Sequence, residues 1–227
     1  MMPGRPSGEE EAVVVGDDDD LSSLFGRNRD WAHGKIHCDP GFFRRLVGQQ
    51  KPRYFWIGCS DSRVPATEIV DLDPGEMFVH RNVANLALAD DPNFAAALQF
   101  AVNVLEVQHI IVVGHYGCGG IQAAMGPESG DAIGRWLAPV RRLHGAHPCK
   151  SSPDNQDRNA LCEWNVEAQV EALSANPVVL ARWARQAPLM LHGWVYAIGD
   201  GLLRKVCEPI ANQQAHIRRA ASQAIAS

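Results

Sequence analysis

The stretch Tyr54-Phe55-Trp56-Ile57-Gly58-Cys59-Ser60-Asp61-Ser62-Arg63 joins a short apolar run to a cluster of polar residues. An apolar run of this length, ended by glycine and turn residues, is typical of a buried β-strand. Cys59, Asp61 and Arg63 follow it at intervals of two residues. A thiolate is a soft metal ligand, whereas a carboxylate is a harder ligand or a proton acceptor. The stretch therefore predicts a strand whose carboxyl end carries candidate metal-binding or catalytic side chains.

A second stretch repeats this arrangement later in the chain. The apolar run His109-Ile110-Ile111-Val112-Val113 leads into Gly114-His115-Tyr116-Gly117-Cys118-Gly119-Gly120. Because ligand sites of open α/β sheets form at the carboxyl ends of parallel strands, the two stretches are expected to meet there. The spacing of His115 and Cys118 lets both side chains reach one metal ion. We predict a zinc site that combines Cys59, His115 and Cys118.

The remaining pattern alternates strand-like and helical segments. The expected strands lie at about 54–59, 77–79, 109–114 and 192–196. The expected helices cover about 21–31, 40–47, 91–105, 119–126, 131–144, 158–174, 177–186 and 211–226. Such alternation predicts an α/β fold with a mostly parallel central β-sheet of about four core strands, flanked by helices.

Length and composition bound the domain organisation. A chain of 227 residues can bury one sizeable core. Residues 1–20 carry two acidic runs and few apolar residues, so we expect a disordered acidic tail before a single zinc-binding catalytic domain at 21–227. The net charge of −5 argues against nucleic-acid or anionic-membrane partners. No membrane span or targeting signal is recognised, which predicts a cytoplasmic protein with reduced cysteines.

The fourth zinc position is open to two interpretations. With three protein ligands the position would hold water, as in catalytic sites, whereas Asp61 as a fourth ligand would close it. Pairing of Asp61 with Arg63 would keep the carboxylate off the metal. Two thiolates also neutralise the charge of Zn²⁺, so its Lewis acidity is expected to be weaker than in a three-histidine site. Any activity that depends on a zinc-bound water should then rise toward alkaline pH.

At these residues the chain resembles the β-class carbonic anhydrases. Cys59-Ser60-Asp61-Ser62-Arg63 and His115-x-x-Cys118-Gly119-Gly120 look like the two signatures of that family. The resemblance covers roughly residues 21–206. It continues, in the expected order, through Pro74-Gly75-Glu76, His80-Arg81-Asn82-Val83-Ala84-Asn85, Leu161-Cys162-Glu163 and His192-Gly193-Trp194.

The resemblance implies an activity and a set of site residues. It implies reversible hydration of carbon dioxide to bicarbonate and a proton, with zinc-bound hydroxide as nucleophile and Asp61 and Arg63 as a catalytic dyad. It also implies a homodimer or homotetramer in which Gln50 reaches the active site across the interface. The positions that match the substrate pocket of the family are Gln50, Phe78, Val83 and Gly119.

One further set of residues points to a subtype. Trp56, Arg81 and Tyr196 resemble a trio that binds bicarbonate at a non-catalytic site in family members that bicarbonate inhibits. The resemblance therefore implies allosteric inhibition by bicarbonate. By their residue types alone, Trp56 and Tyr196 would be core residues and Arg81 could bridge subunits.

Other readings of the zinc residues stay open. A related zinc enzyme could act on carbonyl sulfide or carbon disulfide with the same ligands. A non-catalytic module could use the site for structure, with Asp61 as the fourth ligand. A thiol-redox role is weakest because no Cys-x-x-Cys motif occurs in the sequence.

Overall fold

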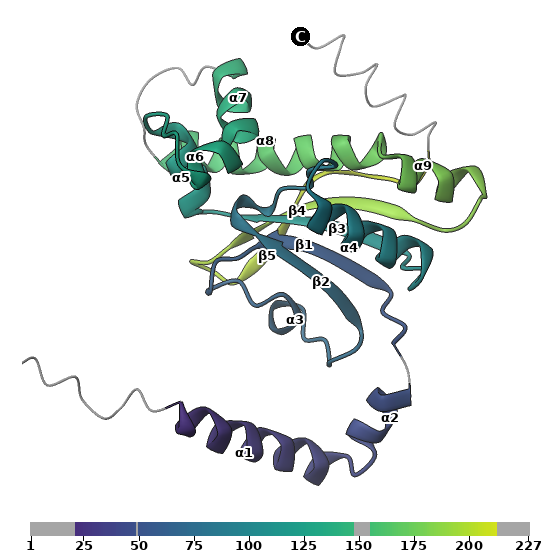
Figure 1. Cartoon of the computed structure of the whole chain (residues 1–227). Coiled ribbons are helices and arrows are strands. Elements are labelled where there is room, and N and C mark those ends of the chain that lie inside the picture. Colours follow the sequence, from purple (N-terminus) through teal and green to yellow (C-terminus); the bar gives the residue numbers. More distant parts are fainter. Residues whose placement is uncertain (1–20, 49, 148–154, 213–227) are drawn as a thin grey trace, which may run out of the picture. The chain divides into compact units, whose positions relative to one another are not determined.

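The computed structural model describes residues 21–48, 50–147 and 155–212 (Figure 1). The chain divides into two compact units, Met1–Gly48 and Gln49–Ser227. The expected acidic tail and nearly all of the expected helix at 211–226 lie outside the described residues. No helix within the described part is long and apolar enough to cross a membrane.

The first unit consists of two helices, α1 (Ser22–Cys38) and α2 (Phe42–Gly48). Between them the Asp39 carboxylate accepts a hydrogen bond from the backbone N–H of Gly41 at 2.9 Å and pairs with Arg45. The Trp31 and Phe43 rings meet edge to face, with centroids 5.6 Å apart. No residue of α1 is buried.

The second unit is built on one five-stranded sheet in the order β2-β1-β3-β4-β5. The strands are β1 (Tyr54–Cys59), β2 (Met77–Asn82), β3 (His109–His115), β4 (Met190–Ala197) and β5 (Leu202–Ile210). The first four pair in parallel and β5 runs antiparallel to β4. The predicted α/β fold with a mostly parallel sheet is therefore confirmed.

The fifth strand was absent from the prediction. It carries Arg204, Lys205 and Glu208, and most of its residues are exposed or half-buried because it lies at the sheet edge. An edge strand with this composition lacks the continuous apolar run that marks the interior strands β1 and β3.

Helices cover the two sheet faces unequally (Figure 1). The larger core lies between one face and the helices α4 (Pro92–Asn103), α8 (Asn155–Ser174) and α9 (Pro177–Ala184). A smaller cluster on the other face contains Trp56, Ile111 and Val113 and is joined by Ala66 of the short helix α3 (Ala66–Ile69). A third cluster gathers at the carboxyl ends of the strands, where α5 (Gly119–Met125) and α7 (Ala138–Ala146) pack with α8.

Two helices begin at capping side chains. The side chains of Asp91 and Asn176 accept hydrogen bonds from the backbone N–H groups of Asn93 and Val178, with a proline following each cap. The helix predicted at 131–144 is instead two helices, α6 (Ala132–Trp136) and α7. The prediction was wrong because Pro139 lacks an amide hydrogen and therefore begins a new helix.

Candidate metal centre and active site

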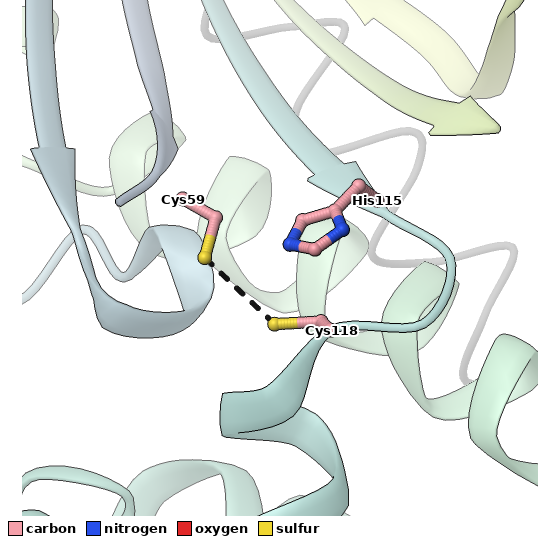
Figure 2. A group of neighbouring side chains, drawn as sticks. All are labelled: Cys59, His115 and Cys118. Atoms are coloured by element: carbon pink, nitrogen blue, oxygen red, sulfur yellow. Dashed lines mark hydrogen bonds between the residues drawn. The ribbon is translucent and has the colours of Figure 1, made fainter. Parts of the chain in front are cut away.

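Two adjacent strands deliver the predicted metal ligands. Cys59 ends β1, His115 ends the neighbouring parallel strand β3, and Cys118 follows three residues later. Gly117 has a φ of 73°, a left-handed conformation that turns the chain back before α5 begins. The ligand atoms of the three side chains all lie within 4.8 Å of one another, and all three residues are buried (Figure 2).

The donor atoms fit a zinc ion. The His115 side chain is fully buried, and its Nε2 atom has no hydrogen-bond partner among the described residues. Its Nδ1 atom lies 3.2 Å from the carbonyl oxygen of Tyr116, so the proton belongs on Nδ1 and the Nε2 lone pair is free for a metal. An unpaired buried nitrogen is costly unless a ligand completes it.

The two thiols lie in contact across the site. Their sulfur atoms are 3.8 Å apart. The hydrogen bond from Cys118 lowers the pKa of the Cys59 thiol, and the same contact raises the pKa of Cys118. Without metal, the two sulfur atoms therefore share one proton. A bound zinc ion would replace that proton, since the thiolate is the form that binds zinc.

Asp61 lies beside this group and is held by Arg63. The guanidinium donates from Nε to Oδ1 at 2.9 Å and from Nη2 to Oδ2 at 2.7 Å, and the backbone N–H of Arg63 adds a bond of 3.0 Å to Oδ1. This bidentate pair holds the pKa of Asp61 well below its usual range. The Asp61 Oδ2 atom also lies 3.7 Å from His115 Nε2. The carboxylate is therefore next to the candidate metal position and engaged by Arg63.

Comparison with known proteins decides the family. A family model described as carbonic anhydrase matches residues 54–203, which is more than half of the chain. This chain belongs to the carbonic anhydrases. A carbonic anhydrase of Emericella nidulans is 41% identical over 184 residues, covering 80% of this chain and 81% of the relative. One from Pseudomonas aeruginosa is 38% identical over 168 residues, covering 70% of this chain and 75% of the relative.

Solved structures assign this carbonic anhydrase to the β-class. The Coccomyxa β-carbonic anhydrase in complex with acetazolamide is 36% identical, with a TM-score of 0.84, and the match covers 86% of this chain and 90% of that one. A tetrameric β-carbonic anhydrase from Sordaria macrospora is 34% identical, with a TM-score of 0.79 and coverages of 84% and 98%.

The predicted pocket residues of this carbonic anhydrase occupy different surroundings. Val83 packs with the cluster that contains Cys59 and Cys118. Gly119 opens α5, and a Cβ built on it would meet no atom within 4 Å. Phe78 lies between the rings of Phe55 and Phe100, with centroids 5.4 and 5.9 Å away. Gln50 is exposed before β1.

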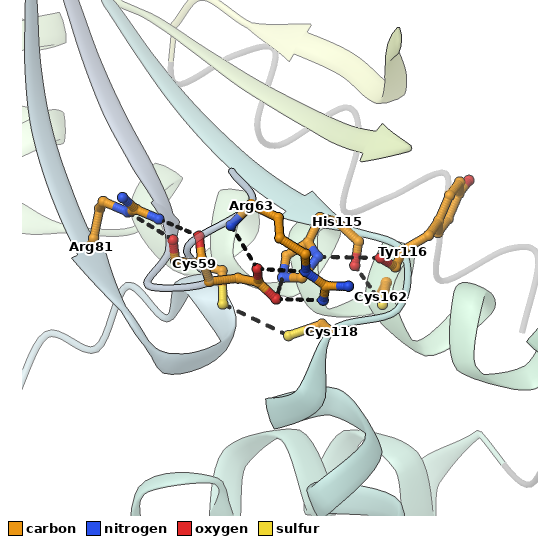
Figure 3. Close-up of polar contacts among 8 residues, drawn as sticks. Cys59, Arg63, Arg81, His115, Tyr116, Cys118 and Cys162 are labelled. Atoms are coloured by element: carbon orange, nitrogen blue, oxygen red, sulfur yellow. Dashed lines mark hydrogen bonds and ion pairs between the residues drawn. The ribbon is translucent and has the colours of Figure 1, made fainter. Parts of the chain in front are cut away.

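The three residues of the predicted bicarbonate trio lie on one sheet face. The register places Trp56, Arg81 and Tyr196 at alternate positions that share a side of the sheet. Trp56 is fully buried, and Tyr196 packs against the same apolar cluster. The Arg81 guanidinium donates to the carbonyl oxygens of Cys59 at 2.9 Å and Asp61 at 2.6 Å (Figure 3). Arg81 therefore contacts the backbone of the segment Cys59–Asp61, which carries a candidate metal ligand, directly.

A buried amide network beside the site was not predicted. Asn165 of α8 donates to the carbonyl oxygen of Ala84 at 2.9 Å, and Gln169 accepts from the N–H of Ala87 at 2.8 Å. These bonds hold a short 3₁₀ turn, Val83–Asn85, in which Ala84 has a φ of 65°. The signal in the sequence was two amides four residues apart within an apolar helix pattern, because buried amides need specific partners.

Proposed function

We propose that this carbonic anhydrase binds one zinc ion through Cys59, His115 and Cys118 and interconverts carbon dioxide and bicarbonate. The observation that carries the proposal is the convergence of two buried thiols on an imidazole nitrogen that has no partner among the described residues. When bound, zinc would supply a Lewis acid that lowers the pKa of a coordinated water, to about 7 in sites of three neutral histidines.

The chain's own residues then take separate roles. The Asp61 carboxylate is ionised and is oriented by Arg63, so it can accept a hydrogen bond from the attacking water and aim it at carbon dioxide. The Nδ1–H of His115 donates to the backbone and keeps the ring in one tautomer. Apolar Val83, beside the ligand cluster, offers a wall suited to a small apolar substrate.

The test measures activity and metal on one sample. Stopped-flow hydration of carbon dioxide from pH 6 to 9, with zinc content determined in parallel, should give one zinc per chain and a rate that rises toward alkaline pH. Hydrolysis of carbonyl sulfide and carbon disulfide is assayed on the same preparation. Bound zinc without hydration at any pH would contradict the proposal and favour a non-catalytic site.

We also propose that bicarbonate inhibits the enzyme at Trp56, Arg81 and Tyr196. Two of these residues are hydrogen-bonded to segments that carry candidate metal ligands. Arg81 donates to the carbonyl oxygens of Cys59 and Asp61 after β1. The carbonyl oxygen of Tyr196 accepts from the backbone N–H of Tyr116, after β3, at 3.0 Å. An anion that draws Arg81 away would release the backbone on which Asp61 sits. This link supports coupling between the two sites.

The bicarbonate site is tested with small changes. Trp56→Ala would leave a cavity in the core at a cost of about 3–5 kcal/mol, so it is a poor probe. Tyr196→Phe removes one hydroxyl, and Arg81→Lys keeps the charge but loses the forked geometry. Both should weaken inhibition of carbon dioxide hydration by added bicarbonate. Inhibition equal to that of the unmodified enzyme in both variants would refute the site.

We further propose a homodimer or homotetramer. Helix α1 buries none of its residues, and Leu24, Phe25 and Trp31 are exposed in the isolated chain. An apolar helix surface of this kind is typical of a subunit interface. Light scattering coupled to size-exclusion chromatography should give a mass of two or four chains, and a monomer at micromolar concentration would contradict the proposal.

A further inference from the structure

Helix α8 contacts the turn that carries two of the metal ligands. The Sγ–H of Cys162 donates to the carbonyl oxygen of His115 at 3.3 Å. Cys118 and Cys162 also belong to one buried cluster. One buried thiol thus bonds to the beginning of the turn from His115 to Cys118 (Figure 3) and packs in the cluster that contains its end.

The next residue of α8 makes a second contact with the same turn. The hydroxyl of Tyr116 donates to the carboxylate of Glu163. The Tyr116 backbone is also fixed, because its N–H donates to the carbonyl oxygen of Tyr196 at 3.0 Å and its own carbonyl accepts from His115 Nδ1 at 3.2 Å. The orientation of this peptide therefore decides where the His115 ring points.

Close packing lets α8 reach the turn. A Cβ on Gly114, the residue before His115, would lie 2.7 Å from the Val166 side chain and 3.5 Å from the Cys162 carbonyl oxygen. A Cβ on Gly193 of β4 would lie 2.9 Å from Val166 as well. Because glycine stands at both positions, α8 packs directly against β3 and β4.

We propose that Cys162 and Glu163 are positioning residues that hold His115 and Cys118 in the geometry of a metal site before the metal binds. The inference rests on the proposed zinc role of those two ligands and adds residues that do not themselves contact the metal. Groups that orient metal ligands typically contribute about 10- to 100-fold in metal affinity. Their loss should therefore appear as faster release of zinc.

The first experiment changes the thiol. Zinc release from the full-length holoprotein to an excess of a chromophoric chelator is followed for Cys162→Val, which keeps the volume but has no donor. Release is expected to be about 10- to 100-fold faster than from the unmodified protein. Cys162→Ser restores a donor and acceptor and should recover most of the slow release. Cys207→Val is the matched control, since Cys207 is another buried thiol but lies in the core between the sheet and α8.

The second experiment changes the other contact and serves if the valine variant fails to fold. Glu163→Leu and Tyr116→Phe each remove one partner of the same bond. Each should speed zinc release, and the double variant should release zinc no faster than the faster single variant because only one bond is lost. Tyr54→Phe is the control for the loss of a tyrosine hydroxyl. In Co²⁺-substituted protein the visible d–d bands should shift in the Cys162→Val and Glu163→Leu variants and not in the controls.

The outcomes separate this inference from the proposed function. If the unmodified protein holds zinc and the Cys162 and Glu163 variants release it at the unmodified rate with unchanged cobalt bands, the positioning role is overturned. Recovery by serine together with unchanged controls supports it. If the unmodified protein holds no zinc, it is the proposed function that fails.

Discussion

The two ends of β3 each carry a histidine, and the two histidines differ in what their nitrogens contact. At the amino end His109 Nδ1 lies 3.1 Å from His192 Nε2, and its ring stacks on Tyr54 with centroids 5.6 Å apart. At the carboxyl end His115 donates from Nδ1 to a backbone carbonyl, and its Nε2 faces two thiols. Because an even number of positions separates them along β3, both side chains lie on the same face of the sheet.

The comparison shows that the groups packed around a histidine, and not the residue type alone, decide whether its ring nitrogen can bind a metal. His109 forms its hydrogen bond with another histidine among aromatic rings, so its ring nitrogen already has a partner. His115 is buried among groups that leave Nε2 without one. Because an unpaired buried nitrogen is unfavourable, a metal ion is bound most favourably at the carboxyl end of β3, where it would pair with His115 Nε2.

The largest expected effect comes from removing each histidine in turn. His115→Ala should leave a protein that holds no stable zinc and hydrates carbon dioxide at the background rate, because one of three ligands is gone. His109→Ala should keep one zinc per chain and near-normal turnover. Zinc analysis and stopped-flow assays on both variants measure the contrast; equal losses in both would remove the distinction between the two ends.

The next effect concerns two aspartate–arginine pairs. Asp61 pairs with Arg63 beside the candidate metal centre, and Asp200 pairs with Arg204 at the turn before β5. Asp61→Asn should lower kcat/KM by about 10²- to 10⁴-fold with zinc retained, since the amide cannot accept as a carboxylate does. Asp200→Asn should leave both zinc content and kcat/KM unchanged. Full activity of the Asp61 variant would show that the carboxylate is not part of the reaction.

The smallest effect is a pH dependence of stability at the amino end of β3. Burial, with a contribution from His109, lowers the pKa of His192 to about 4, and burial also lowers the pKa of His109. Between pH 4 and 6.5 the unfolded chain therefore binds more protons at these histidines than the folded chain, so acidification through this window lowers the free energy of unfolding.

Urea denaturation of the zinc-free protein at pH 7 and pH 5 measures this dependence. Removing zinc with a chelator keeps metal release from contributing to the difference. In His192→Gln the loss of stability between the two pH values should be smaller than in the unmodified chain. The same loss in both proteins would assign the acid sensitivity to other groups.

Local patterns were sufficient for the main elements of the sheet. The apolar runs that end at Cys59 and His115 identified the two neighbouring strands and their carboxyl ends. The edge strand β5 escaped prediction because an exposed strand with several charges does not differ locally from a loop. The break before α7 escaped because the helical pattern runs through Pro139.

The sequence by itself determined which residues could bind a metal and where the chain would present them, because strand ends and glycine turns depend on neighbouring residues. The tertiary structure decided which nitrogen of His115 stays unpaired, how Arg63 engages both oxygens of Asp61, and that Cys162 lies against the ligand turn. The Cys162 contact joins residues 47 positions apart. Such contacts follow from the packing of α8 on the sheet, which no local pattern specifies.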